Sequence, residues 1–139
     1  MIKRIFHFTL AGVLACTLAA CGSSEGKTEM PEAGYRQVGS REAAELMAEE
    51  HGYIILDVRT LEEYEERHIP GAVCIPNETI GNEAPALLPD KEQLILVYCR
   101  SGNRSRQAAA KLAKLGYTNV VEFGGINSWT GETVQGAEI

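Results

Sequence analysis

One short segment combines a cysteine with residue types that stabilise a negative charge on its sulfur. The segment runs from Cys99 to Ser105 and reads CRSGNRS. Gly102 permits a positive φ and a tight turn, so successive backbone N–H groups can point toward one centre. Arg100 and Arg104 bring positive charge to the same loop. Such surroundings lower a thiol pKa from about 8.5 into the range of roughly 3.5–7.5, which predicts a nucleophilic thiolate at neutral pH.

The elements on either side are predicted to hold this loop at a strand-to-helix junction. The run 94–98, LILVY, carries no charge and is typical of a central parallel strand buried on both faces. A helix is expected from about Ser105 to Leu115, with Gly116 at its C-cap. The positive end of its dipole then points at the Cys99 sulfur. The alternative is an inert cysteine in the core, because cysteine is among the most buried residue types.

Strand-like and helical patterns alternate along the rest of the domain. Strands are expected at 53–58, 72–75, 94–98 and 120–123, helices near 41–50, 61–67 and 105–115, and a helical turn at 126–129. Ser40 is a candidate N-cap, and Thr60 with Glu63 forms a capping-box pattern. The segment 78–88 predicts a loop with one helical turn, and 124–125 a turn. This order predicts an α/β fold with a parallel central sheet, helices on both faces and ligands beyond the carboxyl ends of the strands.

Four stretches, taken in order, resemble the rhodanese-like sulfurtransferase family. They are ILDVR at 55–59 with EY at 63–64, HIPGA at 68–72 with Pro76, CRSGNRS at 99–105, and GY at 116–117 through GG at 124–125 to Trp129. The resemblance implies that Cys99 takes a sulfane sulfur from a donor such as thiosulfate. It further implies that Cys99 holds this sulfur as a persulfide and passes it to a thiophilic acceptor such as cyanide or a thiol. The backbone amides of Arg100 to Ser105 would form the cradle.

The side chains of this loop are candidate substrate-binding groups. Arg100 and Arg104 present planar guanidinium forks that suit the oxygens of thiosulfate or a sulfonate, and Arg104 has the alternative role of bracing the loop. Ser101, Asn103 and Ser105 can donate hydrogen bonds to the terminal sulfur. Their alternative roles are those of turn residues and a helix cap.

Loop length favours sulfur over phosphate as the group that is bound. Related phosphatase and arsenate-reductase domains place their arginine one residue farther from the cysteine than Arg104 lies from Cys99. The smaller cup suits a single sulfur better than a tetrahedral oxyanion. The sequence contains no Cys-x-x-Cys pattern, which argues against a thioredoxin-type dithiol.

Residues outside the loop are assigned mainly to structure. Asp57 and Arg59 end a strand at the expected active edge, where an ion pair that braces the next helix is favoured over direct substrate contact. His68 looks like the family's loop histidine; with only three histidines and no ligand pattern, neither metal nor cofactor is expected. Cys74 is expected to pack in the core. The alternative is that it resolves the Cys99 persulfide as a disulfide.

Residues 1–20 have the pattern of a secretory signal. Lys3 and Arg4 precede an apolar run of roughly sixteen residues, which is shorter than the ~20 that a membrane-spanning helix needs. The stretch 18–21, LAAC, resembles the lipobox of bacterial lipoproteins, which implies cleavage before Cys21 and a diacylglycerol on its sulfur. An uncleaved anchor helix is the alternative. A lipid-anchored location at the cell envelope, facing outside the cytoplasm, is expected.

Composition limits the remaining possibilities. The 139 residues leave room for one domain, predicted at 35–135, behind a Gly-, Ser- and Glu-rich flexible tether at 21–34. The net charge of −6 argues against a nucleic-acid partner. The expected partners are a small sulfur donor, a thiophilic acceptor and a membrane. A non-catalytic envelope module that binds a sulfur compound or a partner protein through the same loop is the alternative function.

Overall fold

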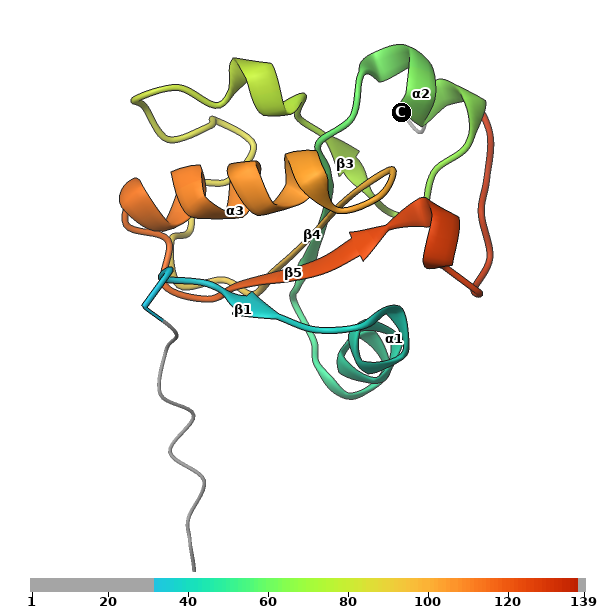
Figure 1. Ribbon diagram of the computed structural model, residues 1–139, viewed down its shortest axis with the longest axis horizontal. Coiled ribbons are helices and arrows are strands. Elements are labelled where there is room, and N and C mark those ends of the chain that lie inside the picture. The colour runs from blue at the N-terminus through green and yellow to red at the C-terminus, as the bar shows by residue number, and fades with distance from the viewer. Residues whose placement is uncertain (1–31, 138–139) are drawn as a thin grey trace, which may run out of the picture.

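The computed structural model describes residues 32–137 as an α/β fold (Figure 1). The predicted signal, Cys21 and most of the predicted tether lie outside the described residues. The elements are, in order, β1 (Arg36–Gln37), α1 (Ser40–Glu49), β2 (Ile54–Asp57), α2 (Leu61–Glu66), β3 (Val73–Cys74), the 3₁₀ helix η1 (Asn77–Thr79), β4 (Ile95–Cys99), α3 (Asn103–Lys114), β5 (Val120–Gly125) and the 3₁₀ helix η2 (Ile126–Ser128).

The five strands form one parallel sheet in the order β1-β5-β4-β2-β3. All residues of the central strand β4 are buried, which explains its uninterrupted apolar sequence. Helix α3 packs on one face of the sheet, and α1 and α2 pack on the other (Figure 1). The predicted fold class is confirmed.

Alternate strand residues fill two separate cores. The core on the α3 face contains Leu56, Val58, Ile95, Val97, Cys99, Ala108, Ala109 and Leu112. The core on the opposite face contains Ala43, Ile55, Tyr64, Leu96, Tyr98 and Phe123, with Cys74 packed against it. Each fully buried aliphatic side chain contributes roughly 1.5–3 kcal/mol to folding. The two cores fix the sheet, and the sheet fixes where the loop after β4 begins.

Several predicted details of the secondary structure are wrong. The N-cap of α1 is Gly39 and no side chain caps this helix, because Ser40 Oγ instead forms a hydrogen bond of 3.0 Å with Ser128 Oγ. Helix α3 begins at Asn103 rather than near Ser105. Residues 124–125, predicted as a turn, extend β5, since Gly125 pairs with the last residue of β4 after an irregularity in the register.

Strand β1 was not predicted at all. It has only two residues and lies at an edge of the sheet, so its sequence carries no measurable period. It is recognisable only because Arg36 pairs with Val121 and Gln37 with Glu122 on β5. The pairing covers the edge of β5 that does not face β4.

His68 lies inside the structure rather than at a ligand site. Its side chain is fully buried, its Nδ1 is 2.8 Å from the Tyr64 carbonyl oxygen, and the two rings stack with centroids 3.7 Å apart. Its backbone also exchanges two hydrogen bonds with Val134, which ties the end of the described chain to the segment after α2.

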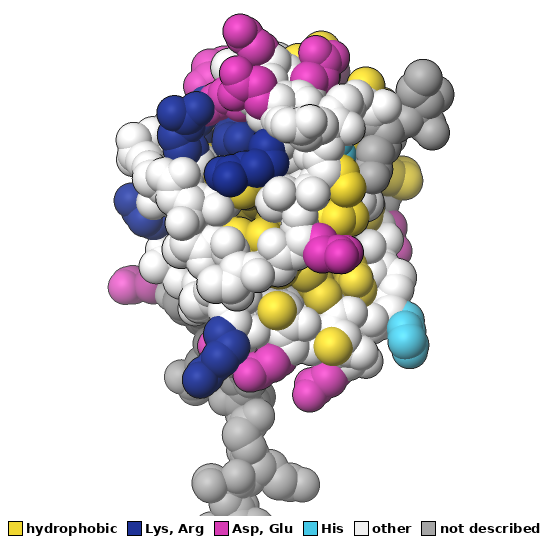
Figure 2. Space-filling view, turned by 90° about the vertical axis from the view of Figure 1, so that its right-hand side faces the viewer, with side chains coloured by type: hydrophobic (Ala, Val, Ile, Leu, Met, Phe, Trp, Pro, Cys, Tyr) yellow, Lys and Arg dark blue, Asp and Glu magenta, His cyan; other side chains and the backbone are white. Residues whose placement is uncertain are grey.

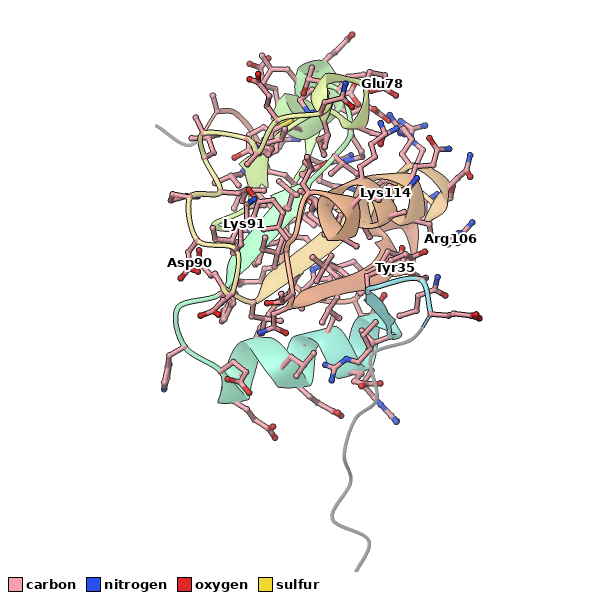
Figure 3. All side chains as sticks on the ribbon, turned by 90° about the vertical axis from the view of Figure 1, so that its left-hand side faces the viewer. Tyr35, Glu78, Asp90, Lys91, Arg106 and Lys114 are labelled. Atoms are coloured by element: carbon pink, nitrogen blue, oxygen red, sulfur yellow. The ribbon has the colours of Figure 1, made fainter. Side chains whose placement is uncertain are left out.

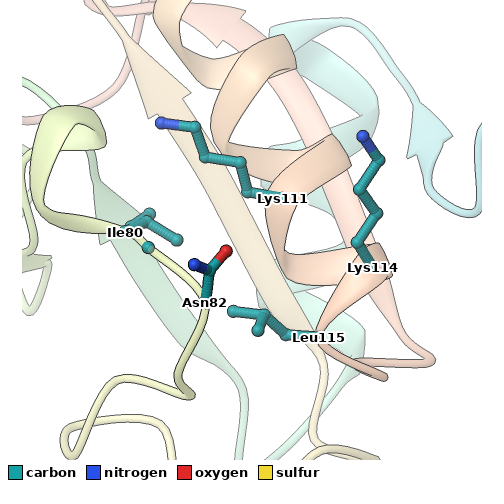
Figure 4. Close-up of a pocket in the computed structure, with 6 residues that line it drawn as sticks. Ile80, Asn82, Lys111, Lys114 and Leu115 are labelled. Atoms are coloured by element: carbon teal, nitrogen blue, oxygen red, sulfur yellow. The ribbon is translucent and has the colours of Figure 1, made fainter.

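The surface at the C-terminal end of α3 contains a pocket. The pocket, of about 400 Å³, lies between this end of the helix and the segment 80–82 (Figure 4). Lys111 lines it, and its Nζ already donates to the Asn77 carbonyl at 2.7 Å. Lys91, which is labelled in Figure 3, donates to the Leu115 carbonyl at 2.7 Å and so satisfies one acceptor at the end of the helix. Within residues 32–137, no helix is long and apolar enough to cross a membrane.

Candidate active site

The Cys99 sulfur lies at the junction of β4 and α3. Cys99 is the last residue of β4 and only 1% exposed. The backbone N–H of Gly102 donates to Sγ at 3.0 Å, and Sγ lies 3.4 Å from Ser105 Oγ. Helix α3 starts at Asn103, so the sulfur lies at the positive end of its dipole. The structure thus brings the predicted nucleophile and the predicted amide cradle together.

Two glycines let the loop take this shape. Gly102 adopts φ +105°, which a residue with a side chain rarely adopts, and it serves as the N-cap of α3. Gly125 lies against the loop: a Cβ at this position would be 2.0 Å from the carbonyl oxygen of Arg100. Sequence reasoning treated Gly125 only as a turn residue. Its close approach is what allows the loop to cross the end of β5.

The hydrogen bonds around Cys99 favour its charged form. Burial raises the pKa of the Cys99 thiol. The Ser105 hydroxyl and the backbone N–H groups of Ser105, Gly102 and Ser101 lower it, and the net result is a pKa below the usual thiol value. The direction agrees with the thiolate predicted from the sequence.

Cys74 is a different kind of thiol. Burial, followed by the charge of Asp57, raises its pKa to about 11. Cys74 is in register with Asp57, and Asp57 with Tyr98, so two strand spacings of roughly 4.8 Å each separate Cys74 from β4. Cys74 and Cys99 also belong to cores on opposite faces of the sheet. A disulfide needs Cα atoms within about 7 Å, so the resolving role of Cys74 requires movement of the backbone.

Sequence reasoning missed Glu63 as a member of this site. Both carboxylate oxygens face Arg104, with Nη1–Oε2 and Nη2–Oε1 distances of 2.7 and 2.9 Å, and Arg100 Nε donates to Oε1 at 3.2 Å. The predicted capping box is confirmed, because Glu63 also accepts from the backbone N–H of Thr60. The Arg104 guanidinium, aided by Thr60 and opposed by burial, lowers the pKa of Glu63 to about 2. One carboxylate therefore starts α2 and holds the cysteine loop.

The two loop arginines are held differently. The Arg104 side chain is 26% exposed and both of its terminal nitrogens contact Glu63, which matches the bracing role. The Arg100 side chain is 57% exposed and contacts Glu63 through Nε alone. Arg100 and Glu63 also line a polar pocket of about 330 Å³. Figure 2 shows one face of the molecule on which acidic side chains gather directly above basic ones.

Asp57 and Arg59 form the buried pair that was favoured from the sequence. Arg59 Nη2 lies 2.6 Å from Asp57 Oδ2 and also donates to the carbonyl of Arg67 at 2.6 Å. Their side chains are 0% and 4% exposed, respectively. The pair joins the end of β2 to the residue that follows α2 and so holds that helix in place.

The three uncharged polar residues of the loop differ in their exposure to solvent. Ser101 and Asn103 are exposed, whereas Ser105 is fully buried. Ser105 does not have its alternative role as helix cap, because Gly102 is the N-cap of α3, and its Oγ donates to Glu122 Oε1 at 2.6 Å. Glu122, on β5, is 3% exposed and was also missed from the sequence. Among residues 32–137, no group of three or more His, Cys, Asp or Glu side chains could hold a metal ion.

Comparison with known proteins decides the family. The sequence profile of the rhodanese-like domain family matches residues 40–132. The chain belongs to the rhodanese-like family. It is 36% identical over 81 residues to thiosulfate sulfurtransferase PspE of Escherichia coli K12, with 58% of this chain and 78% of PspE covered. It is also 36% identical over 112 residues to the putative sulfur carrier protein YrkF of Bacillus subtilis 168, where 80% of this chain matches 57% of YrkF.

Solved structures place this rhodanese-like chain in the same fold. A rhodanese from E. coli solved with anions superposes with a TM-score of 0.56 at 34% identity, covering 60% of this chain and 99% of the other. A rhodanese-like domain protein from Staphylococcus aureus superposes with a TM-score of 0.62 at 28% identity, covering 73% and 99%. Both the fold and the family agree with the resemblance found in the sequence.

Proposed function

We propose that this rhodanese-like protein is a sulfurtransferase that carries a sulfane sulfur as a persulfide on Cys99. The observation that carries the proposal is the Cys99 sulfur, held 3.0 Å from the Gly102 amide at the start of α3. The lowered pKa of its thiol supports a nucleophilic role. The relatives named as a thiosulfate sulfurtransferase and a sulfur carrier support the same reaction class.

The reaction has two steps, and both depend on the same sulfur. The Cys99 thiolate attacks the outer sulfur of thiosulfate, a new S–S bond forms, and sulfite leaves with the electrons of the old S–S bond. An acceptor thiolate or cyanide then attacks the terminal sulfur, and Cys99 leaves as a thiolate. A low thiol pKa makes Cys99 a good leaving group in the second step. No external oxidant or reductant is consumed.

Arg100 is the residue we assign to the oxyanion of the donor. Its side chain is more exposed than that of Arg104. In the part of the chain that the structure describes, Glu63 contacts Arg100 through Nε and not through its two terminal nitrogens. The net charge of −6 repels an anion at long range, so the donor must be held locally. A guanidinium edge can bind two sulfonate oxygens at once.

The location at the cell envelope is also a proposal. The LAAC sequence before the tether supports lipid attachment at Cys21, and two or more acyl chains suffice for stable membrane binding. If Cys21 is acylated, Cys21→Ala moves the protein from the membrane to the soluble fraction. Equal membrane binding of the variant would contradict the lipid anchor.

Thiocyanate formation tests the activity directly. The full chain in mild detergent is incubated with thiosulfate and cyanide, beside Cys99→Ser and the control Cys74→Ser. We expect loss of thiocyanate formation in Cys99→Ser only, and a gain of one sulfur mass on the Cys99 peptide after thiosulfate treatment. Equal rates in wild type and Cys99→Ser would refute the proposal. Neither thiocyanate nor a sulfur gain with any donor would identify the chain as a non-catalytic binding module.

A further inference from the structure

A buried carboxylate lies beside the reactive sulfur and has no part in the reaction described above. Glu122 is on β5, is 3% exposed and shares the sheet face of Cys99, because it is in register with Val97 of β4. Its Oε1 accepts hydrogen bonds from Ser105 Oγ at 2.6 Å and from the backbone N–H of Gly124 at 2.8 Å. Burying a carboxylate is costly, and here it faces a site built to stabilise another anion.

Ser105 connects the sulfur to this carboxylate. The Cys99 thiol donates to Ser105 Oγ across 3.4 Å, and Ser105 Oγ donates to Glu122 Oε1 across 2.6 Å. The same hydroxyl also lies within 3.0 Å of the Gly102 carbonyl and 3.2 Å of the Gly124 carbonyl. A hydroxyl has one hydrogen, and the Glu122 oxygen is its nearest acceptor. Three buried side chains therefore form a continuous hydrogen-bond path that starts at the reacting atom.

Electrostatics disfavours two negative charges on this path. Two anions a few ångströms apart in a poorly solvated space repel strongly, so the ionised form of one disfavours the ionised form of the other. The Cys99 thiolate is thus stabilised when the proton that it loses rests on Glu122.

We propose that Glu122 is the internal proton acceptor for Cys99, reached through Ser105. As the Sγ–H bond breaks, Ser105 Oγ takes that proton and passes its own to Glu122 Oε1. The product is a thiolate, a neutral Glu122 and an intact hydroxyl that now donates to the sulfur. All the hydrogen bonds of the path reverse direction, and no proton leaves the protein.

The proton returns at the end of the cycle, and in this respect the inference rests on the proposed function. While Cys99 carries the persulfide, its Sγ bears no proton and Glu122 keeps it. When the acceptor removes the terminal sulfur, Cys99 leaves as a thiolate. Glu122 then gives the proton back through Ser105, and the Sγ–H bond forms again.

Few other charged groups face Glu122. On α3, the Arg106 side chain borders Gly102, as Glu122 does. A Cβ added to Gly102 would lie 3.0 Å from Arg106 Nη1 and 3.7 Å from Glu122 Oε1. From β1, the neutral Gln37 is in register with Glu122 and donates to the phenol of Tyr35 at 3.1 Å. From β4, Val97 is in register with it. Since arginine keeps its charge in proteins, Cys99 and Glu122 are the two groups of this cluster between which a proton can move.

The pH dependence of Cys99 alkylation tests the path without any sulfur donor. The full chain in mild detergent is treated with iodoacetamide from acid to alkaline pH, and modification of the Cys99 peptide is followed by mass spectrometry. In wild type, the rate of Cys99 alkylation is expected to rise with pH in two steps separated by a plateau. Between the steps Cys99 and Glu122 share one proton, which leaves a constant fraction of Cys99 as thiolate. Glu122→Gln keeps an oxygen that accepts both hydrogen bonds but cannot take a proton. The alkylation rate of Glu122→Gln is expected to rise in a single step. At pH values under this step, the rate falls about tenfold per pH unit.

Ser105 variants provide the second, independent arm. Ser105→Ala removes the hydroxyl that links the two groups and is expected to lower the alkylation rate on the plateau, whereas Ser105→Thr retains the hydroxyl and is expected to keep the wild-type profile. The control Glu62→Gln changes an exposed carboxylate on α2 and should keep both steps. Two steps in Glu122→Gln, or one step in wild type, would overturn the proposal. If Glu122→Gln does not fold, the Ser105 pair decides. Loss of the path with thiocyanate formation intact leaves the proposed function standing.

Discussion

Glu63 and Arg104 form a bidentate ion pair that joins the first turn of α2 to the loop around Cys99. Both contacts are shorter than 3 Å, and the partners are 41 positions apart in the sequence. Glu63 simultaneously closes the capping box with Thr60. The start of α2 and the shape of the loop around Cys99 are thus stabilised by the same carboxylate.

Replacing Glu63 should therefore destabilise the fold and the loop together. Glu63→Gln keeps the size of the side chain but loses its charge-assisted hydrogen bonds, and we expect the free energy of unfolding to fall by roughly 1–3 kcal/mol. Urea unfolding measures the change. The matched control is Glu62→Gln, whose exposed side chain lies one position away. Equal stability of the two variants would show that the ion pair contributes nothing.

The same ion pair predicts a pH dependence of stability. The folded protein lowers the pKa of Glu63 from its usual 4.5 to about 2, so the ionised form stabilises the fold above pH 4.5. That contribution declines as the pH falls from 4.5 toward 2. The difference in unfolding free energy between wild type and Glu63→Gln should shrink over this interval. A constant difference from pH 7 to pH 2 would contradict this assignment.

The two arginines should have separable effects on kinetics. Arg100→Ala is expected to raise KM for thiosulfate about tenfold with a smaller change in kcat, because a charge-assisted contact to the donor is lost. Arg104→Ala should lower kcat and thermal stability together, since it releases the loop from Glu63. A neutral organic trisulfide as donor should be insensitive to Arg100→Ala. The exposed Arg41→Ala serves as control for the loss of a charge.

Gly125 should not tolerate a side chain. Its Cβ would lie 2.0 Å from the Arg100 carbonyl oxygen and 2.5 Å from the Ser101 nitrogen, so the loop must move. We expect Gly125→Ala to abolish sulfur transfer and to destabilise the fold by about 2 kcal/mol or more. Gly81→Ala is the control, because a Cβ there meets no atom within 4 Å. Activity assays and thermal unfolding of both variants check the prediction.

The two thiols should react at very different rates. At neutral pH, iodoacetamide should modify Cys99 well before Cys74, whose pKa near 11 leaves almost no thiolate. Cys74→Ser should retain sulfur transfer. Peptide mapping under non-reducing conditions should find no Cys74–Cys99 disulfide, and its detection after thiosulfate treatment would show that the sheet opens during the reaction.

Local sequence patterns were sufficient for the fold class and for the position of the candidate nucleophile. The uncharged run before Cys99 requires a buried strand, and Gly102 followed by a helical pattern requires a tight turn at a helix start. The capping box of Thr60 and Glu63 was likewise readable, because its hydrogen bonds lie within a single helical turn. Propensity, period and turn chemistry act between near neighbours, so one sequence records them directly.

Tertiary structure alone decided which distant side chains complete the site. It placed Glu63 on Arg104, Glu122 on Ser105 and Gly125 beneath the Arg100 carbonyl. It also put Cys74 on the opposite face from Cys99, although both lie on strands of one sheet. Strand order and register produce these contacts, and neither leaves a periodic signal in the chain. The sequence by itself therefore predicted which cysteine is the candidate nucleophile, whereas the packing of the sheet determined which distant side chains surround its loop.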